Sequence, residues 1–441
     1  MTTILTRREL LGGTGLAALA SGAPGASARA AQSARGQVSD LRPLIIERVE
    51  PIVIRTPPDR IGFDEPLMQP RVGAVTGGPG MWNRLDHATP TRFKGYEQAT
   101  LVKITTTEGL VGWGECHSPS APRMHQRILS DLFAPLLRGQ DARWINPLWE
   151  RMFSTERVRG YSTGAHFEAL AGVDLALWDL LGRAMGVPVY QLLGGKYRDG
   201  IPLYTGIGGA TAEALVQSAE RAVASGLKVV KMGFRKGENT SDVERVEAVA
   251  AAMRPHGQVC LDSLGAFKLY EAIQVGRIFD RIGNIGWFED ALLPDDWPAY
   301  TELAAALDTP VCVGEMLSNR FQFRDLLTAR GADIINPDVC RAGGISECQR
   351  IAALAHAYGA LWTPHVSTGT VLYFAASLHL AVATANCVIM EGGGKLSGPL
   401  GNALVRTPFR VDQGTAYVPE APGFGVEWNE EALARVTARE A

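Results

Sequence analysis

Apolar stretches of strand length alternate with amphipathic stretches of helix length between residues 202 and 394. A polar residue ends each apolar stretch, and these residues stand 31, 27, 26, 23, 27 and 26 positions apart by subtraction of their numbers. Each interval holds a loop, one helix and the next strand, which is the repeat of parallel βα units. The polar residues at the strand ends are Lys231, Asp262, Glu289, Glu315, Asp338, His365 and Glu391.

This alternation predicts a (β/α) barrel. With the apolar stretch 203–206 at its start, the series contains eight strands, and strands alternating with helices over this length favour a barrel over an open sheet. In a barrel the carboxyl ends of the strands meet at one mouth, so the polar residues indicate one shared active site. A single strand-end carboxylate is equally well explained as a helix cap, but capping does not explain seven polar residues at the same position.

The chain before the barrel predicts a small antiparallel unit. Residues 44–55 and 98–107 alternate as strands, and residues 108–109 form the turn into a third strand at 110–115. Helical stretches follow at 125–139, 145–154 and 166–185. After the barrel the chain returns to turn-rich strand character, and we expect this return to pack against the N-terminal unit.

An insert rich in glycine and proline separates the first two of these strands, over residues 56–97. A loop of this length is usually a lid, a binding loop or a disordered segment. Some of its residues could line a pocket for an anionic, hydroxylated ligand, although each one taken alone is better explained by loop packing or exposure to solvent. These residues are Arg60, Phe63, Trp82, His87 and Arg92.

The first 31 residues predict a twin-arginine signal peptide. Arg7 and Arg8 precede a weakly apolar run rich in glycine and alanine, and residues 28–30 offer a small-x-small cleavage site. The run is too short and too rich in glycine for a membrane span. We therefore expect a mature protein that is periplasmic or secreted; the alternative is an ordinary basic, disordered N-terminus.

Composition sets bounds on partners and redox state. The 441 residues carry a net charge of −3 without a basic cluster, so nucleic acid and anionic membrane surfaces are poor partners. The cysteines show no CxxC spacing and are expected to be buried thiols, although a disulfide in an oxidising compartment stays open. They are Cys116, Cys260, Cys312, Cys340, Cys348 and Cys387.

Together with the strand-end series, three motifs resemble the enolase superfamily, specifically its mandelate racemase and muconate lactonizing enzyme group. They are GVDLALWDLLGRAMGVPVYQLLGG (172–195), DVCRAGGISECQRIAALAHAYG (338–359) and VPEAPGFGVEW (418–428). The resemblance runs from about residue 45 to the C-terminus. It implies a modified (β/α)7β barrel over 166–394 and an α+β capping domain built from 44–165 and the C-terminal return 395–441. It also implies a homo-oligomer.

The same resemblance implies one magnesium ion per subunit, held by Asp262, Glu289 and Glu315. The residue types support this independently, because three carboxylates without a nearby cysteine or histidine make a hard oxygen site suited to Mg²⁺. Such an ion can bind a substrate carboxylate and stabilise the enediolate that forms when the alpha proton leaves.

Four further residues are assigned by the resemblance. His365 matches the general base of the family and Asp338 the carboxylate that orients it, an arrangement that raises imidazole basicity and fixes the tautomer. Glu391 matches a position that hydrogen-bonds the substrate; bonding of loop backbone explains it equally well. Lys231 matches the first lysine of a Lys-x-Lys pair, where it would neutralise the substrate carboxylate.

Two departures from the family pattern bear on the reaction. Gly233 stands where many members carry the second lysine, which acts as a base on the face opposite the histidine, and Leu264 stands where many carry Asn or His. A slip of two residues in the alignment would instead make Lys231 that base, and the sequence leaves this alternative open.

The loss of a second base favours dehydration, because racemisation needs a base on each face whereas elimination can use one residue as base and then as acid. We expect an acid sugar dehydratase that converts an aldonate or aldarate into a 2-keto-3-deoxy acid. The alternatives are a racemase, epimerase or cycloisomerase of the same superfamily, and a sugar-acid sensor that has lost its chemistry. The intact ligands argue against the sensor, because buried charges are costly to keep.

Overall fold

The structure is a computed structural model that describes residues 42–56, 97–119, 121–234 and 241–438. The predicted signal peptide and nearly all of the 56–97 insert therefore lie outside the described residues. So do the pocket candidates of that insert, which are Arg60, Phe63, Trp82, His87 and Arg92. Pro43–Ala441 makes one compact unit.

Eight parallel strands form a closed barrel, as the sequence predicts. Each strand pairs with the next from β4 to β10, and β11 pairs back with β4. A bridge between Trp362 and Cys387 joins β10 to the segment that leads into β11. The strands are β4 (Gly200–Gly206), β5 (Val229–Gly233), β6 (Gln258–Asp262), β7 (Ile285–Glu289), β8 (Val311–Val313), β9 (Ile334–Ile335), β10 (Leu361–Trp362) and β11 (Met390–Glu391).

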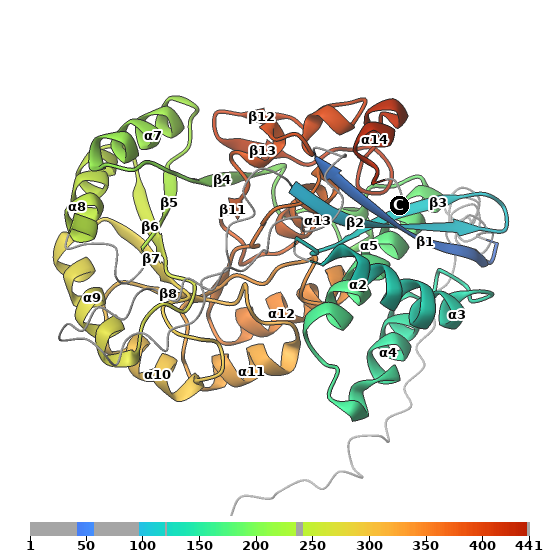
Figure 1. The fold of residues 1–441 in the computed structure, drawn as a ribbon, viewed down its shortest axis with the longest axis horizontal. Helices are drawn as coiled ribbons and strands as arrows, with labels where there is room; N and C mark the ends of the chain where they lie inside the picture. Colours follow the sequence, from blue (N-terminus) through green and yellow to red (C-terminus); the bar gives the residue numbers. More distant parts are fainter. Residues whose placement is uncertain (1–41, 57–96, 120, 235–240, 439–441) are drawn as a thin grey trace, which may run out of the picture. The chain divides into compact units, whose positions relative to one another are not determined.

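Seven helices connect these strands and surround the barrel on its outer side (Figure 1), which gives the predicted (β/α)7β order. They are α7 (Ala212–Ala224), α8 (Ser241–Met253), α9 (Leu269–Ile282), α10 (Trp297–Ala306), α11 (Arg320–Thr328), α12 (Gly344–Ala357) and α13 (Val371–Val382). Several begin at a polar side chain that accepts a backbone N–H, namely Thr211, Asp296, Asn319 and Thr370. The strand-end carboxylates are thus not needed to cap these helices and remain available for another role.

A three-stranded antiparallel sheet precedes the barrel, in the order β1 (Ile46–Thr56), β2 (Glu97–Thr106), β3 (Val111–Cys116), which confirms the predicted hairpin. Helices α2 (Pro122–Arg127) and α3 (Ala134–Leu137), joined by the π-helical turn η2 (Ile128–Phe133), precede α4 (Ile145–Thr155), α5 (Gly164–Met185) and α6 (Val189–Leu192). No helix among the described residues is long and apolar enough to cross a membrane.

Helix α5 lies between the sheet and the barrel. On one side it approaches β3 so closely that a Cβ atom at Gly114 would lie 1.9 Å from the carbonyl oxygen of Gly172. On the other side Asp174 accepts hydrogen bonds from the backbone and the hydroxyl of Ser346 in α12. The contact between cap and barrel is therefore made by buried polar groups as well as by apolar packing.

The C-terminal return contacts both parts of the molecule. The expectation that it packs against the N-terminal unit holds for its end, where α14 (Glu430–Val436) is followed by a hydrogen bond from Ala438 N to Val53 O of 2.8 Å. It is wrong for the hairpin of β12 (Val411–Asp412) and β13 (Thr415–Tyr417), because β13 pairs antiparallel with barrel strand β4. Strand β11 pairs only with residues 203 and 204 of β4. The backbone groups of residues 200–202 need another partner, and β13 pairs with them.

The inside of the barrel below its mouth is filled by large and sulfur-containing side chains. Tyr204, Cys260, Trp287 and Cys312 form one buried cluster, in which the rings of Tyr204 and Trp287 meet edge to face at 5.2 Å. All six cysteines are buried free thiols. The barrel is thus closed below the strand ends, and its polar chemistry is confined to the mouth.

The close approach of β3 and α5 gives a stability prediction. In Gly114→Ala the added methyl group would meet backbone atoms of Gly172 and Ala176 at 1.9 and 2.7 Å, so the helix or strand has to shift. We expect a loss of about 1–3 kcal/mol or more in the free energy of unfolding by urea titration. Gly208→Ala is the control, because nothing lies within 4 Å of its added Cβ; equal losses in the two variants would contradict this account.

Candidate active site

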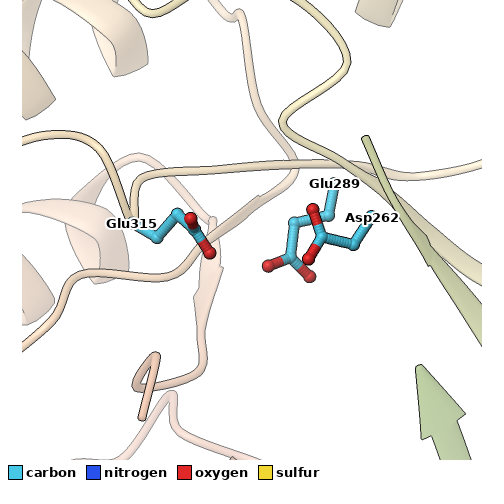
Figure 2. Close-up of side chains that lie close together, drawn as sticks. All are labelled: Asp262, Glu289 and Glu315. Atoms are coloured by element: carbon cyan, nitrogen blue, oxygen red, sulfur yellow. The ribbon is translucent and has the colours of Figure 1, made fainter. Parts of the chain in front are cut away.

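Three carboxylates meet at the mouth of the barrel. Asp262 and Glu289 are the last residues of β6 and β7, and Glu315 stands two residues after β8. One oxygen from each lies within 4.8 Å of the others. Figure 2 shows Glu315 reaching this space from one side and Asp262 and Glu289 from the other. The structure thus brings together the three residues that the sequence predicts as metal ligands.

Neighbouring side chains fix the orientation of Glu289, which is completely buried. Its Oε2 accepts a hydrogen bond from Trp287 Nε1 at 2.8 Å, and its Oε1 accepts one from Asn336 Nδ2 at 3.0 Å. Neither donor was predicted from the sequence. Trp287 could have been found, because it stands two residues before Glu289 and so faces the same side of the strand.

The charges of the trio oppose one another. Burial, helped by the nearby charges of Asp262 and Glu315, outweighs the lowering effect of Lys231 and raises the pKa of Glu289 to about 7. Burial likewise raises the pKa of Asp262. A cluster of buried carboxylates directed at one space matches the donor set of a hard divalent cation, which would offset this repulsion.

Lys231 lies beneath the trio. Its Nζ is 3.0 Å from Glu289 Oε1, 3.2 Å from Glu391 Oε1 and 3.5 Å from Asp262 Oδ2. Burial disfavours the ammonium, but these carboxylates outweigh it and raise the pKa of Lys231 well above its ordinary value. In the strand pairing Lys231 is opposite Cys260, whereas Gly233 is opposite Asp262. Gly233, and not Lys231, therefore stands level with the strand ends.

His365 is held between Asp338 and the trio. Its Nδ1 lies 2.8 Å from Asp338 Oδ2, and its Nε2 lies 3.1 Å from Glu315 Oε2. Burial lowers the pKa of His365, but Glu315 and the hydrogen bond to Asp338 outweigh burial and raise it to about 9. The predicted pair is therefore present, and the second ring nitrogen of His365, Nε2, faces the carboxylates.

Asp338 is itself held by several donors. Besides His365, it accepts hydrogen bonds from the backbone N–H of Cys340, at 2.8 Å, and from the hydroxyl of Tyr373. Burial raises the pKa of Asp338, but the bond from His365 and nearby positive side chains outweigh it and hold the pKa well below its usual range. Tyr373 lies in α13 and gave no sequence signal.

Glu391 makes the bond to loop backbone that was one of its two interpretations from the sequence, and it also pairs with Lys231. The other interpretation, a hydrogen bond to the substrate, stays a prediction. The Oε1 atom of Glu391 is paired with Lys231, and its Oε2 accepts the backbone N–H of Val366 at 3.1 Å. Burial raises the pKa of Glu391, but Lys231 and His365 outweigh it and lower the pKa to about 2. Leu264, at the other family departure, has φ of 47° in the turn after β6.

Comparison with known proteins agrees with this architecture. Residues 84–194 match the mandelate racemase / muconate lactonizing enzyme N-terminal domain, and residues 214–432 match the family described as enolase C-terminal domain-like. A closed parallel barrel with an acidic trio at its strand ends defines an enzyme of the enolase type. The chain belongs to the enolase superfamily, in its mandelate racemase and muconate lactonizing enzyme group.

Three similar proteins have names that bear on function. The D-galactarolactone cycloisomerase of Agrobacterium fabrum is 33% identical over 350 residues, covering 76% of this chain and 89% of that protein. The D-galactonate dehydratase of Verminephrobacter eiseniae is 35% identical over 344 residues, covering 75% and 88%. The solved structure of the 3,6-anhydro-D-galactonate cycloisomerase from Zobellia galactanivorans has a TM-score of 0.73 at 27% identity, covering 90% of this chain and 100% of that one.

The position of Lys231 gives a prediction about the protein without metal. In Lys231→Met the three carboxylates lose their buried counter-charge, so we expect a loss of about 3–5 kcal/mol in the free energy of unfolding, measured in urea with EDTA. Lys196→Met is the control, because Lys196 forms partly exposed ion pairs with Asp199 and Glu420 that are worth about 0–1 kcal/mol. A loss in Lys231→Met no larger than in the control would show that Lys231 does not balance this cluster.

Proposed function

We propose that the protein is a magnesium-dependent dehydratase of acid sugars, converting an aldonate or aldarate into a 2-keto-3-deoxy acid. The observation that supports this most directly is the arrangement of His365. Its Nδ1 is bonded to the buried carboxylate of Asp338, while its Nε2 faces Glu315 at the mouth of the barrel. A substrate whose carboxylate lies over the acidic trio would present its alpha carbon beside this nitrogen.

His365 then acts twice. With Glu315 engaged as a metal ligand, the negative charge that raises the pKa of His365 would be offset, which favours the neutral imidazole. The neutral ring donates its Nδ1–H in a hydrogen bond to the Asp338 carboxylate, has a lone pair on Nε2 and takes the alpha proton of the substrate. Asp338 stabilises the imidazolium that results. His365 next donates the same proton to the departing 3-hydroxyl group, which leaves as water, and the enol that remains becomes the 2-keto product.

Lys231 acts in this proposal as a counter-charge and not as a base. Its ammonium is engaged by three carboxylates, one of which is Glu391, and these favour the protonated form. Gly233, level with the strand ends, has no side chain to serve as a second base. A single base favours elimination over racemisation.

Asp262, Glu289 and Glu315 would hold the magnesium ion. The fit rests on three oxygen donors directed at one space and on the raised pKa values that their repulsion and burial produce. Bound there, the ion supplies positive charge that stabilises the carboxylate as it gains negative charge.

The relatives support the substrate class and one alternative. Proteins named D-galactonate dehydratase are similar to this chain over about three quarters of its length, at 35% identity in one case. Two similar proteins are instead named cycloisomerases, one acting on D-galactarolactone and one on 3,6-anhydro-D-galactonate. Opening of such a ring also needs one base at the alpha carbon, so the alternative of a cycloisomerase uses the same residues.

Three sequence predictions stay predictions alongside this proposal. They are export by the twin-arginine route to the periplasm or the medium, assembly into a homo-oligomer, and the division of the chain at residues 165 and 395. Fractionation of cells, sedimentation and limited proteolysis would test them in that order.

The proposal predicts a 2-keto-3-deoxy product. The protein from about residue 31 onward, with Mg²⁺, should convert one or a few members of a library of aldonates and aldarates, as measured by semicarbazide absorbance. His365→Asn should lower kcat by about 10²- to 10⁴-fold because the general base is lost. His256→Asn, at an exposed position, should leave kcat unchanged.

The alternatives have distinct outcomes in the same screen. Conversion of a lactone or an anhydro acid without any 2-keto-3-deoxy product from an open-chain acid would establish the cycloisomerase. Uptake of solvent deuterium at the alpha carbon of recovered substrate, without keto product, would establish an epimerase or racemase. Either result would refute dehydration.

The metal site predicts stabilisation by Mg²⁺. At a concentration 100 times the dissociation constant, the ion should raise the free energy of unfolding by about 2.7 kcal/mol, seen as a higher Tm that EDTA reverses. Glu289→Gln should abolish this shift because a ligand is lost. Glu431→Gln should retain it, since Glu431 is exposed on α14. A shift that persists in Glu289→Gln would show that Mg²⁺ binds elsewhere.

A further inference from the structure

The end of capping strand β3 touches the barrel beside the His365 and Asp338 pair. Glu115, which is 1% exposed, accepts hydrogen bonds at Oε1 from the backbone N–H of Thr370, at 2.9 Å, and at Oε2 from the Thr370 hydroxyl. A Cβ atom at Gly369 would lie 2.6 Å from Glu115 Oε1. A buried carboxylate from the cap is thus bonded to the loop that follows His365.

Thr370 connects Glu115 to helix α13. Its side-chain oxygen accepts the backbone N–H of Leu372 at 3.1 Å while its hydroxyl hydrogen is donated to Glu115. The carboxylate therefore lies at the N-terminal end of a twelve-residue helix, where the helix dipole favours negative charge. Glu115 fixes the position of the first turn of α13.

Tyr373 lies in this first turn and reaches the catalytic pair. Its hydroxyl donates to Asp338 Oδ2, the same oxygen that accepts the Nδ1 proton of His365, and accepts the backbone N–H of Ser367 at 3.1 Å. Burial and Asp338 raise the pKa of Tyr373 well above its ordinary value, so the phenol remains a donor. A continuous series of hydrogen bonds and one helical turn therefore connects the cap to His365.

His117, which directly follows β3, makes further contacts that support the position of Tyr373. The backbone N–H of His117 donates to Cys340 O at 3.1 Å, in the loop that follows Asp338. The His117 ring accepts a hydrogen bond at Nδ1 from Arg341 at 3.2 Å and meets the Tyr373 ring edge to face at 6.3 Å. The loops after both catalytic residues are thus held by the cap.

We propose that Tyr373 and Glu115 are positioning residues for the reaction, which orient the Asp338 carboxylate and through it the imidazole of His365. The inference rests on the proposed function only for the role of His365 as base. Without the Tyr373 hydroxyl, Asp338 Oδ2 keeps only His365 as its hydrogen-bonded partner, and the carboxylate is oriented by the Cys340 backbone N–H at Oδ1 alone. Without Glu115, the first turn of α13 that carries Tyr373 loses its anchor in the cap.

Kinetics test the role of both residues. Tyr373→Phe should lower kcat by about 10- to 100-fold, as removal of an orienting hydrogen bond behind a catalytic group does, with KM and the Mg²⁺-dependent shift in Tm unchanged. Glu115→Ala should lower kcat similarly, and Glu115→Gln, which keeps one acceptor oxygen, should restore part of it. The double variant of Glu115→Gln and Tyr373→Phe should lose less than the product of the two single losses, because both act through Asp338.

A spectroscopic signal tests the inference without any turnover. The His365 Nδ1 proton, bonded to a buried carboxylate, should give a downfield proton resonance in the magnesium-loaded protein, assigned by its absence in His365→Asn. The resonance should move in Tyr373→Phe and in Glu115→Gln. It should stay in place in Tyr190→Phe, the control, which removes from a buried tyrosine a hydroxyl bonded to Glu420.

The outcomes separate the two proposals. A resonance that moves in both variants while no acid sugar is converted would support the positioning role and refute the dehydratase. An active wild-type enzyme whose kcat and resonance are unchanged in Tyr373→Phe and Glu115→Gln would overturn the positioning role and leave the dehydratase standing. An equal effect of Tyr190→Phe would also overturn it, because the changes would then reflect general loosening of the fold.

Discussion

The constraint on which the structure depends is the repulsion among carboxylates buried at one end of the barrel. Asp262, Glu289 and Glu315 are brought within 4.8 Å by strands that end at the same level, and such a cluster is costly in a protein interior. Lys231 offsets part of the cost from below. The donors to Glu289 offset another part by fixing its oxygens, which leaves the remaining negative charge directed at a single space where a cation can bind. The fold thus places mutually repelling negative charges at the position where the proposed reaction needs a bound cation.

The relation between cap and barrel follows from close packing rather than from a flexible hinge. Gly114 allows α5 to approach β3, and α5 in turn bonds α12 through Asp174. Because the strand and the helix are fixed in this way, the carboxylate of Glu115 at the end of β3 has a defined position relative to the barrel. The cap is therefore part of the same rigid framework as the residues at the mouth, over the part of the chain that the structure describes.

Much of the barrel and its site could be predicted because their signals are local. A strand followed by a polar residue, repeated at similar intervals, gave the order of the strands and the acidic trio, and the family resemblance gave the pairing of His365 with Asp338. Tyr373 and Glu115 could not be found in this way. Glu115 and its partner Thr370 are 255 positions apart, and a tyrosine in an apolar helix looks like an ordinary core residue. The pairing of β13 with β4 was missed for a different reason, since strands of two or three residues leave no alternating pattern.

The pairing partners of strand β4 determine how late in synthesis on the ribosome this strand can be completely paired. Leu203 and Tyr204 pair with residues 390 and 391, and residues 200–202 pair with residues 415–417. One edge of β4 consequently stays open until almost the whole chain has been made, and an open strand edge invites pairing with other chains. A polypeptide that ends before residue 390 would keep that edge unpaired. Such incomplete chains would be bound by chaperones or would aggregate, whereas the complete chain covers the edge.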